Sequence, residues 1–208
     1  MSEALRDWND HYATGHLPWD TGKASGHLTR LVSERGLSGK ALDVGCGTGT
    51  NSLWLAGHGF SVLGLDIAPL AVEAARAKAE QAREPECRFE VLDFLSEEVP
   101  GGPFELVFDR GVFHTFDAAE TRARFAARVA ELLTPDGLWL SLLGSTEGAP
   151  RDTGPPRRSA RDVADAIEPA LELVELRATT FDSDMAWPAW TCLSRRRAQP
   201  AQPSSRRD

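Results

Sequence analysis

The chain has 208 residues, 41% of them hydrophobic and 26% charged, and a chain of this size buries about 70% of its unfolded surface in one core. We therefore expect one globular domain. No window approaches the roughly 18 consecutive apolar residues of a membrane-spanning helix. The first 30 residues carry Asp7, Asp10 and Asp20 in place of an apolar signal core, so we expect neither a membrane protein nor a cleaved secretory signal.

The cysteines indicate a reducing environment. Cys46, Cys87 and Cys192 are odd in number and far apart, and the sequence has no CxxC motif and no Cys/His cluster. This pattern indicates neither a disulfide framework nor a zinc site. We predict a cytoplasmic protein without a metal.

The net charge of −8 is unevenly distributed along the chain. Residues 195–208 hold five arginines and one aspartate, so they carry +4 and the remaining 194 residues carry −12. An acidic body argues against nucleic acid as the main partner, because affinity for phosphates comes from clustered Lys and Arg. The tail contains Pro200 and Pro203 and little apolar area. We therefore predict one domain over residues 1–194 and a disordered basic tail over residues 195–208.

Predicted strands and helices alternate along the chain. Strands are expected at residues 41–45, 61–66, 87–93, 104–109, 137–143, 170–181 and 187–195, and helices at residues 51–56, 69–83, 118–133 and 159–167. Residues 144–158, rich in Gly, Pro and Arg, form a long loop in this scheme, and we consider it a possible lid. The alternation predicts an α/β fold, a doubly wound, mostly parallel (Rossmann-like) sheet with helices on both faces.

Ligands of such sheets bind beyond the carboxyl ends of the strands. The first predicted strand ends in Gly45, Cys46, Gly47, Thr48 and Gly49, where glycines permit close approach of a ligand to the backbone. The next strand ends in Asp66, 17 residues after Gly49, where a carboxylate accepts hydrogen bonds from ribose hydroxyls. The two strand ends together predict a nucleoside-containing cofactor.

The spacing of the glycines differs from the dinucleotide fingerprint GxGxxG, and Asp43 precedes them. A carboxylate at this place would repel a diphosphate and suits a cationic amino-acid moiety. The string DVGCGTG, followed by GLDIAP, closely resembles the class I S-adenosylmethionine-dependent methyltransferases over residues 36–143. The resemblance implies a seven-stranded sheet with an antiparallel last strand, which the two C-terminal strands fit.

The resemblance also implies which residues bind the cofactor. The loop from Asp43 to Gly49, with Gly45, Cys46, Gly47 and Thr48, would border the methionine moiety, and Asp66 would hold the ribose. In similar enzymes, residues at the positions of Ile67, Asp93 and Phe94 contact the adenine, and Asp109 would lie at the same site. Ordinary core packing is an equal alternative for Phe94. Ala68 stands where the family often has Ser or Thr, so the usual helix-capping oxygen is absent.

Residues 8–22, WNDHYATGHLPWDTG, are unusually rich in aromatic and acidic side chains. The segment resembles the N-terminus of the thiopurine S-methyltransferase-like group, which includes thiol, halide and tellurite methyltransferases. In those enzymes the segment closes over cofactor and substrate, so residues 1–35 would cover the site, with Trp8 and Trp19 as aromatic walls. The alternative is that the two tryptophans fix an N-terminal helix to the sheet.

The fourth predicted strand ends in Asp109-Arg110-Gly111, which resembles a segment of thiopurine methyltransferases whose arginine faces the substrate. Arg110 would stabilise an anionic acceptor or pair with Asp109. His114 is a candidate general base or a polar contact of the loop. The continuation Val112-Phe113-His114 departs from the human-type thiopurine enzymes, which leaves the acceptor open.

The main hypothesis is methyl transfer from S-adenosylmethionine, giving S-adenosylhomocysteine, to a small-molecule acceptor, above all a thiol or similar soft nucleophile. O- or N-methylation with His114 or Asp109 as base, a non-catalytic cofactor-binding protein and an NAD-dependent oxidoreductase are the alternatives. We expect no nucleic-acid or membrane partner, and a monomer or weak dimer.

Overall fold

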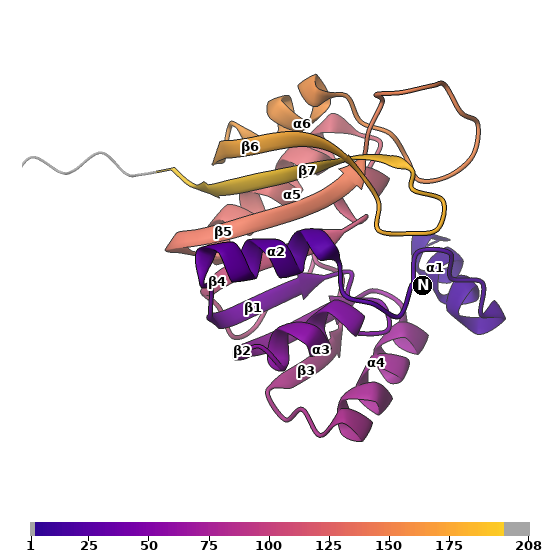
Figure 1. The fold of residues 1–208 in the computed structure, drawn as a ribbon, viewed down its shortest axis with the longest axis vertical. Coiled ribbons are helices and arrows are strands. Elements are labelled where there is room, and N and C mark those ends of the chain that lie inside the picture. Colours follow the sequence, from indigo (N-terminus) through magenta and orange to yellow (C-terminus); the bar gives the residue numbers. More distant parts are fainter. Residues whose placement is uncertain (1–2, 198–208) are drawn as a thin grey trace, which may run out of the picture.

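The computed structural model describes residues 3–197, and its centre is a seven-stranded sheet in the order β3-β2-β1-β4-β5-β7-β6 (Figure 1). The strands are β1 (Gly39–Val44), β2 (Phe60–Asp66), β3 (Cys87–Val91), β4 (Phe104–Arg110), β5 (Leu133–Gly144), β6 (Leu171–Thr180) and β7 (Pro188–Arg196). The first five strands run parallel, and β7 is antiparallel to both β5 and β6. The predicted doubly wound sheet with an antiparallel last strand is confirmed.

Helices cover both faces of the sheet because neighbouring strand residues point to opposite sides. In β1, Ala41 belongs to an apolar cluster with α2 (Gly26–Arg35), α3 (Thr50–Ala56) and α4 (Pro69–Ala82). The next residue, Leu42, belongs to a cluster with α5 (Ala119–Leu132) and α6 (Ala160–Ile167) on the other face. Strands that are apolar on both faces are typical of a parallel sheet between two helical layers.

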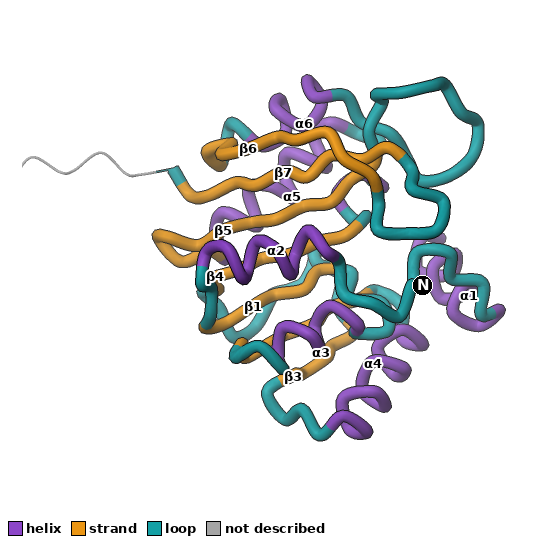
Figure 2. The backbone as a smooth tube through the Cα atoms, viewed as in Figure 1, coloured by secondary structure: helices purple, strands orange, loops and turns teal. Residues whose placement is uncertain are grey.

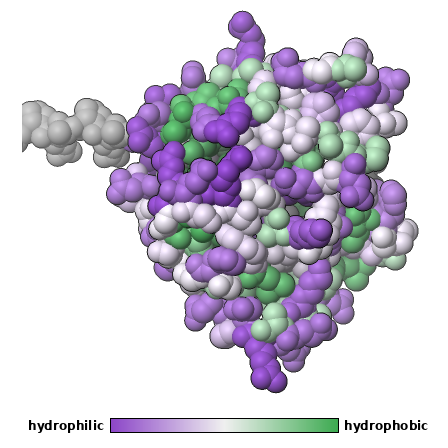
Figure 3. All heavy atoms as spheres, viewed as in Figure 1, coloured by the Kyte–Doolittle hydropathy of each residue, from purple (hydrophilic) through white to green (hydrophobic). Residues whose placement is uncertain are grey.

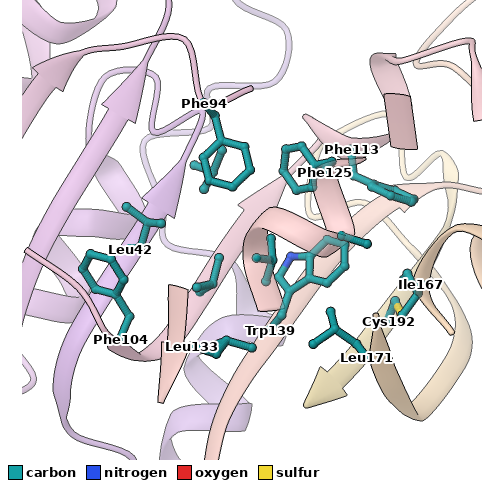
Figure 4. Packing of buried hydrophobic residues seen from close by; sticks show 14 of the residues in the cluster. Leu42, Phe94, Phe104, Phe113, Phe125, Leu133, Trp139, Ile167, Leu171 and Cys192 are labelled. Carbon is teal, nitrogen blue, oxygen red and sulfur yellow. The ribbon is translucent and has the colours of Figure 1, made fainter. Parts of the chain in front are cut away.

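The cluster that contains Leu42 also contains Trp139, the largest of the fully buried side chains (Figure 4). The Trp139 ring lies 5.5 Å from Phe113 and 5.7 Å from Phe125, measured between ring centroids. On the face shown in Figure 3, apolar residues form separate patches between polar ones. The two apolar clusters lie inside, between sheet and helices.

The structure differs from the sequence prediction in one helix and in the start of the tail. Helix α2 was not predicted, although its buried Leu28, Leu31 and Val32 follow helical spacing. The predicted start of the disordered tail is wrong, because β7 continues to Arg196 and Arg195 forms two hydrogen bonds with Glu172. The rest of the predicted tail, residues 198–208, lies outside the described residues.

Three segments gather beyond the carboxyl ends of the parallel strands, where the cofactor was predicted. They are α1 (Glu3–Thr14), the loop of residues 144–158 and the loop of residues 181–187 (Figure 1). The connections at this edge are mostly irregular, as the tube in Figure 2 shows. None of the helices in residues 3–197 has the length and hydropathy needed to cross a membrane.

Candidate active site

The glycine loop between β1 and α3 has a backbone that only glycine adopts easily. Gly45, Gly47 and Gly49 have φ angles of 68°, 55° and 82°, and this left-handed region is costly for residues with a Cβ. A Cβ at Gly45 would lie 2.1 Å from the Val112 side chain, and one at Gly49 would lie 2.8 Å from Phe89. The loop is thus closely packed in a conformation that suits glycine, and it lies at the carboxyl edge of the sheet because it follows β1.

Two buried carboxylates lie under this loop. Asp66 accepts hydrogen bonds from the backbone N–H groups of Gly47 and Ala68, both at 2.9 Å, and so joins the glycine loop to the turn before α4. Asp43 accepts a hydrogen bond of 2.6 Å from the Ser52 hydroxyl. Burial raises the pKa of both carboxyls, that of Asp43 to about 7. The loop is therefore bordered by two acidic groups whose hydrogen-bond donors are neutral.

The N-terminal segment lies over the glycine loop. The Tyr12 hydroxyl is 3.0 Å from the position that a Cβ of Gly47 would take, and the pKa of Tyr12 is raised by burial and by Asp66. The Tyr12 ring is 6.3 Å from that of Trp19, and Trp19 is 5.6 Å from Trp8. The two predicted tryptophans thus form one aromatic cluster with Tyr12, which the sequence analysis did not single out. Tyr12 stands in the same string as Trp8, WNDHY, and this position was the sequence signal that could have indicated it.

Polar contacts also hold this segment in place. Asp20 accepts a 2.6 Å hydrogen bond from the Thr48 hydroxyl, and the Lys78 ammonium lies 3.9 Å from Asp20. Farther along, Asn9 accepts a hydrogen bond of 3.1 Å from the backbone N–H of Leu70 at the start of α4. Asp20, Lys78 and Asn9 were not predicted as site residues, because their partners lie 28 to 61 residues away in the sequence.

Asp109, predicted as a base or cofactor ligand, is fully buried in the structure. It accepts hydrogen bonds from the N–H groups of Val112 and Phe113, at 3.2 and 3.1 Å, and from Trp139 Nε1 at 2.9 Å. Burial raises the pKa of this carboxyl. This geometry argues against the predicted role, because a carboxylate enclosed by three donors holds the turn after β4. A contact of Asp109 with the acceptor or the cofactor stays a prediction.

His114 is also buried, and its Nδ1 accepts a hydrogen bond of 2.7 Å from the backbone N–H of Gly144. Burial lowers the pKa of the imidazole to about 3, with a further contribution from Arg158 and Arg151. A general base for neutral pH needs a pKa near 7. The geometry thus disfavours the base and supports the alternative of a polar contact.

Arg110 connects two covering segments of the site. Its guanidinium donates hydrogen bonds to the carbonyl of Trp19 at 2.7 Å and to that of Asp182 at 3.1 Å, and it lies 5.8 Å from the centre of the Phe181 ring. The predicted alternative of a pair with Asp109 does not occur. Both hydrogen-bonding partners are neutral carbonyls, and the carboxylates of Asp182 and Asp20 act on the guanidinium through their charge without a direct ion pair to it. The guanidinium can therefore still attract an anion.

The predicted adenine contacts Ile67 and Asp93 follow the ends of the neighbouring strands β2 and β3, whereas Phe94 packs in the core. Asp93 accepts hydrogen bonds from the Leu95 N–H and the Ser96 hydroxyl, at 2.9 and 2.7 Å. Phe94 is buried in the core with its ring 4.6 Å from Phe125 (Figure 4), which agrees with the packing alternative. Ile67 is half-buried beside Asp66 at the edge. Contacts of Asp93 and Ile67 with adenine stay predictions.

The loop of residues 144–158 is closed at its base. Arg158 N donates to Gly144 O at 2.9 Å, and the Arg158 side chain pairs with Asp117 at 2.7 Å. Arg151 lies 4.8 Å from the ring centre of Trp187, in the loop of residues 181–187. These contacts join two loops at the site, and movement as a lid stays a prediction. In the part of the chain that the structure describes, no cluster of three or more His, Cys, Asp or Glu could hold a metal ion.

Comparison with known proteins decides the family. The sequence profile described as thiopurine S-methyltransferase (TPMT) matches residues 3–184, which is most of the chain. The chain belongs to this family. It is similar to probable thiol methyltransferase 2 of Arabidopsis thaliana, with 34% identity over 72% of the chain and 65% of that protein. It is also 34% identical to thiocyanate methyltransferase 1 of Brassica oleracea, over 85% of the chain and 76% of that protein.

Solved structures have the same fold. The family member aligns with a TM-score of 0.76 and 26% identity to a structure titled "Conversion of a Disulfide Bond into a Thioacetal Group during Echinomycin Biosynthesis", over 86% of this chain and 85% of that one. Another, the 1,6-didemethyltoxoflavin-N1-methyltransferase of Burkholderia thailandensis with bound S-adenosylhomocysteine, aligns with a TM-score of 0.76 and 17% identity, over 94% of this chain and 88% of that one. As a member of the thiopurine S-methyltransferase family with thiol and thiocyanate methyltransferases among its relatives, the chain is an S-adenosylmethionine-dependent methyltransferase, and the NAD alternative is set aside.

The residues present fit this cofactor. The glycine loop has no side chain of its own at Gly45, Gly47 and Gly49 and lies beside Tyr12, and Asp66 at the end of β2 retains acceptor capacity for hydroxyl groups. Asp43 and Asp66 suit a cation and disfavour phosphates. Asp66 and the loop of Gly45, Gly47 and Gly49 would hold the cofactor.

Cofactor affinity should rise as the pH is raised through about 7, because Asp43 ionises there and only the ionised carboxylate attracts a cation. Binding near this pH should therefore release protons. Titration calorimetry in two buffers with different ionisation enthalpies would measure the release. The Asp43→Asn variant should bind more weakly and lose both the release and the pH dependence; an unchanged release would assign it to another group.

Proposed function

We propose that this family member methylates a small acceptor that arrives as a soft anion, above all an ionised thiol. The observation that carries the proposal is the state of the three side chains at the end of β4. Asp109 is enclosed by donors and His114 has a depressed pKa, whereas the Arg110 guanidinium keeps its charge beside two neutral carbonyls. Such a site favours an acceptor that needs no base.

When bound, S-adenosylmethionine supplies a methyl group on a positively charged sulfur, which keeps the bonding electron pair as the methyl leaves. The chain's own residues bind the cofactor and the acceptor, orient them and exclude water. The Trp8, Tyr12 and Trp19 cluster would cover the glycine loop, and Arg110 would attract the anion and lower the pKa of a bound thiol. The thiol and thiocyanate methyltransferases among the relatives support this acceptor class.

Incubation with methyl-labelled S-adenosylmethionine and a panel of acceptors tests the proposal. The panel contains aliphatic and aromatic thiols, thiocyanate, iodide, selenide and tellurite, with phenols and amines of matched size as comparison. We expect methylated products from the soft anions, with rates that rise as the fraction of ionised thiol rises. Transfer to phenols or amines without transfer to any soft anion would contradict the proposal.

O-methylation is the second candidate. It is favoured by the match to the 2-heptyl-1-hydroxyquinolin-4(1H)-one methyltransferase of Mycobacteroides abscessus, which is 27% identical over 75% of this chain and 72% of that protein. A hydroxylated quinolone added to the same panel separates the two candidates. A hydroxyl acceptor of low pKa would also arrive ionised, so the panel should include phenols of both low and high pKa.

A further inference from the structure

His114 is a buried imidazole whose two nitrogens have different surroundings. Its Nδ1 lies 2.7 Å from the backbone nitrogen of Gly144. An amide N–H can only donate, so Nδ1 must be the bare, accepting nitrogen. In the neutral ring the proton then resides on Nε2. The hydrogen bond to Gly144 thus makes the ring a donor at its other end.

The backbone around Gly144 keeps this arrangement in place. Gly144 is the last residue of β5, and its carbonyl accepts from Arg158 N at 2.9 Å. A Cβ at Gly144 would lie 2.1 Å from the carbonyl oxygen of Pro156, so this part of the chain is packed closely against the 144–158 loop. The N–H group that selects the tautomer therefore has little freedom to turn away.

Nε2 points toward space that a glycine leaves open. A Cβ at Gly111 would lie 3.4 Å from Nε2, and among the described residues Nε2 has no hydrogen-bond partner. The Phe181 ring lies 5.9 Å from the imidazole and 5.8 Å from the Arg110 guanidinium, so Phe181 is next to both. His114 and Arg110 thus contribute two donors around one aromatic ring at the edge of the sheet.

The charges near His114 favour an anion at this place. Arg151 and Arg158 of the 144–158 loop act on the imidazole and lower its pKa, together with burial. Arg110 on β4 adds a further positive charge, and the Asp109 carboxylate is enclosed by its own donors. At neutral pH a ring with such a pKa stays neutral and keeps the proton on Nε2.

We infer that His114 is a specificity-determining acceptor ligand: its Nε2–H donates a hydrogen bond to the anionic atom that becomes methylated, and it takes no proton in the reaction. The inference rests on the proposed function. During transfer the acceptor's lone pair forms the bond to the methyl carbon, its negative charge is lost, and the N–H bond of His114 stays intact. The site thereby selects acceptors that are ionised before they bind, such as thiols of low pKa.

Two substitutions separate the functions of the two ring nitrogens. In His114→Asn the amide oxygen can still accept from Gly144 N–H, but the Nε2–H donor is gone. In His114→Gln the terminal amide restores a donor near the former Nε2. Loss of a hydrogen bond to a charged atom reduces kcat/KM by about 10- to 100-fold. We expect this loss for a thiophenol with His114→Asn, and at least partial recovery with His114→Gln, at unchanged cofactor affinity.

Controls keep the result independent of folding. His58 is an exposed histidine two residues after α3, and His58→Asn should leave the kinetics unchanged. Wild-type kcat/KM should rise with pH along the ionisation of each thiol, so the midpoint should move from acceptor to acceptor. A midpoint that stays constant across acceptors and disappears in His114→Asn would show proton uptake by His114 and overturn the inference.

A spectroscopic measurement tests the tautomer without turnover. Nitrogen-15 NMR of the histidine side chains, in the complex with S-adenosylhomocysteine, should show the His114 signals as a protonated Nε2 and a bare Nδ1. Addition of thiocyanate should shift the Nε2–H proton. A protonated Nδ1, or an Nε2–H signal that does not shift when thiocyanate is added, would contradict the inference. Failure of the proposed function would instead appear in the acceptor panel, as transfer to phenols or amines alone.

Discussion

Gly45→Ala should weaken S-adenosylmethionine binding by about 100-fold or more, since the added Cβ would lie 2.1 Å from the Val112 side chain at a backbone φ of 68°. The left-handed conformation alone costs about 1–2 kcal/mol for alanine, and overpacking adds about 1–3 kcal/mol. The glycine loop or the turn after β4 must shift to relieve the contact. Calorimetric titration with the cofactor and chemical denaturation would measure affinity and stability separately.

Two matched variants isolate the cause. Gly59→Ala introduces the same methyl at a φ of 89°, but no atom lies within 4 Å of the new Cβ. It should cost only the backbone strain and leave cofactor affinity unchanged. Gly45→Ala combined with Val112→Ala should recover part of the affinity, because the crowding atom is removed. Wild-type binding by the single Gly45→Ala variant would show that the loop does not hold the cofactor.

Asp109→Ala should reduce the free energy of unfolding by about 3 kcal/mol or more, since each of three buried donors left without a partner costs at least about 1 kcal/mol. The three donors are Val112 N, Phe113 N and Trp139 Nε1. Denaturant titration at neutral pH would measure the loss. Asp117→Ala, in an exposed residue paired with Arg158, should lose less than about 1 kcal/mol.

A second substitution at Asp109 distinguishes a structural role of its carboxylate from a catalytic one. In Asp109→Asn, we expect activity to fall only as far as the folded fraction falls, because Asp109 is enclosed and does not reach the acceptor. A variant that remains folded with wild-type stability but loses turnover would restore Asp109 as a base. Activity and circular dichroism measured on the same sample at several temperatures distinguish these outcomes.

Much of the fold follows from local patterns. Alternating apolar strands and helices predicted the doubly wound sheet, and adjacent residues such as Ala41 and Leu42 pack on opposite faces as expected. Helix α2 was not predicted, although Leu28, Leu31 and Val32 have helical spacing, because the sequence before the first strand was interpreted as a segment that covers the site. The strand prediction ended within one residue of β7, but the tail was predicted to start at Arg195, whereas Glu172 and the Leu133 carbonyl provide partners for Arg195 and Arg196.

The sequence by itself determined the place of the site and the class of cofactor, because the carboxyl ends of parallel strands meet at one edge and their residues are fixed once the strands are known. Only the tertiary structure shows which partners the individual side chains there have. The role of His114 depends on an N–H group 30 residues away, and that of Arg110 on carbonyls 91 and 72 residues away. A side chain's protonation state and access follow from such distant partners, which no local pattern contains.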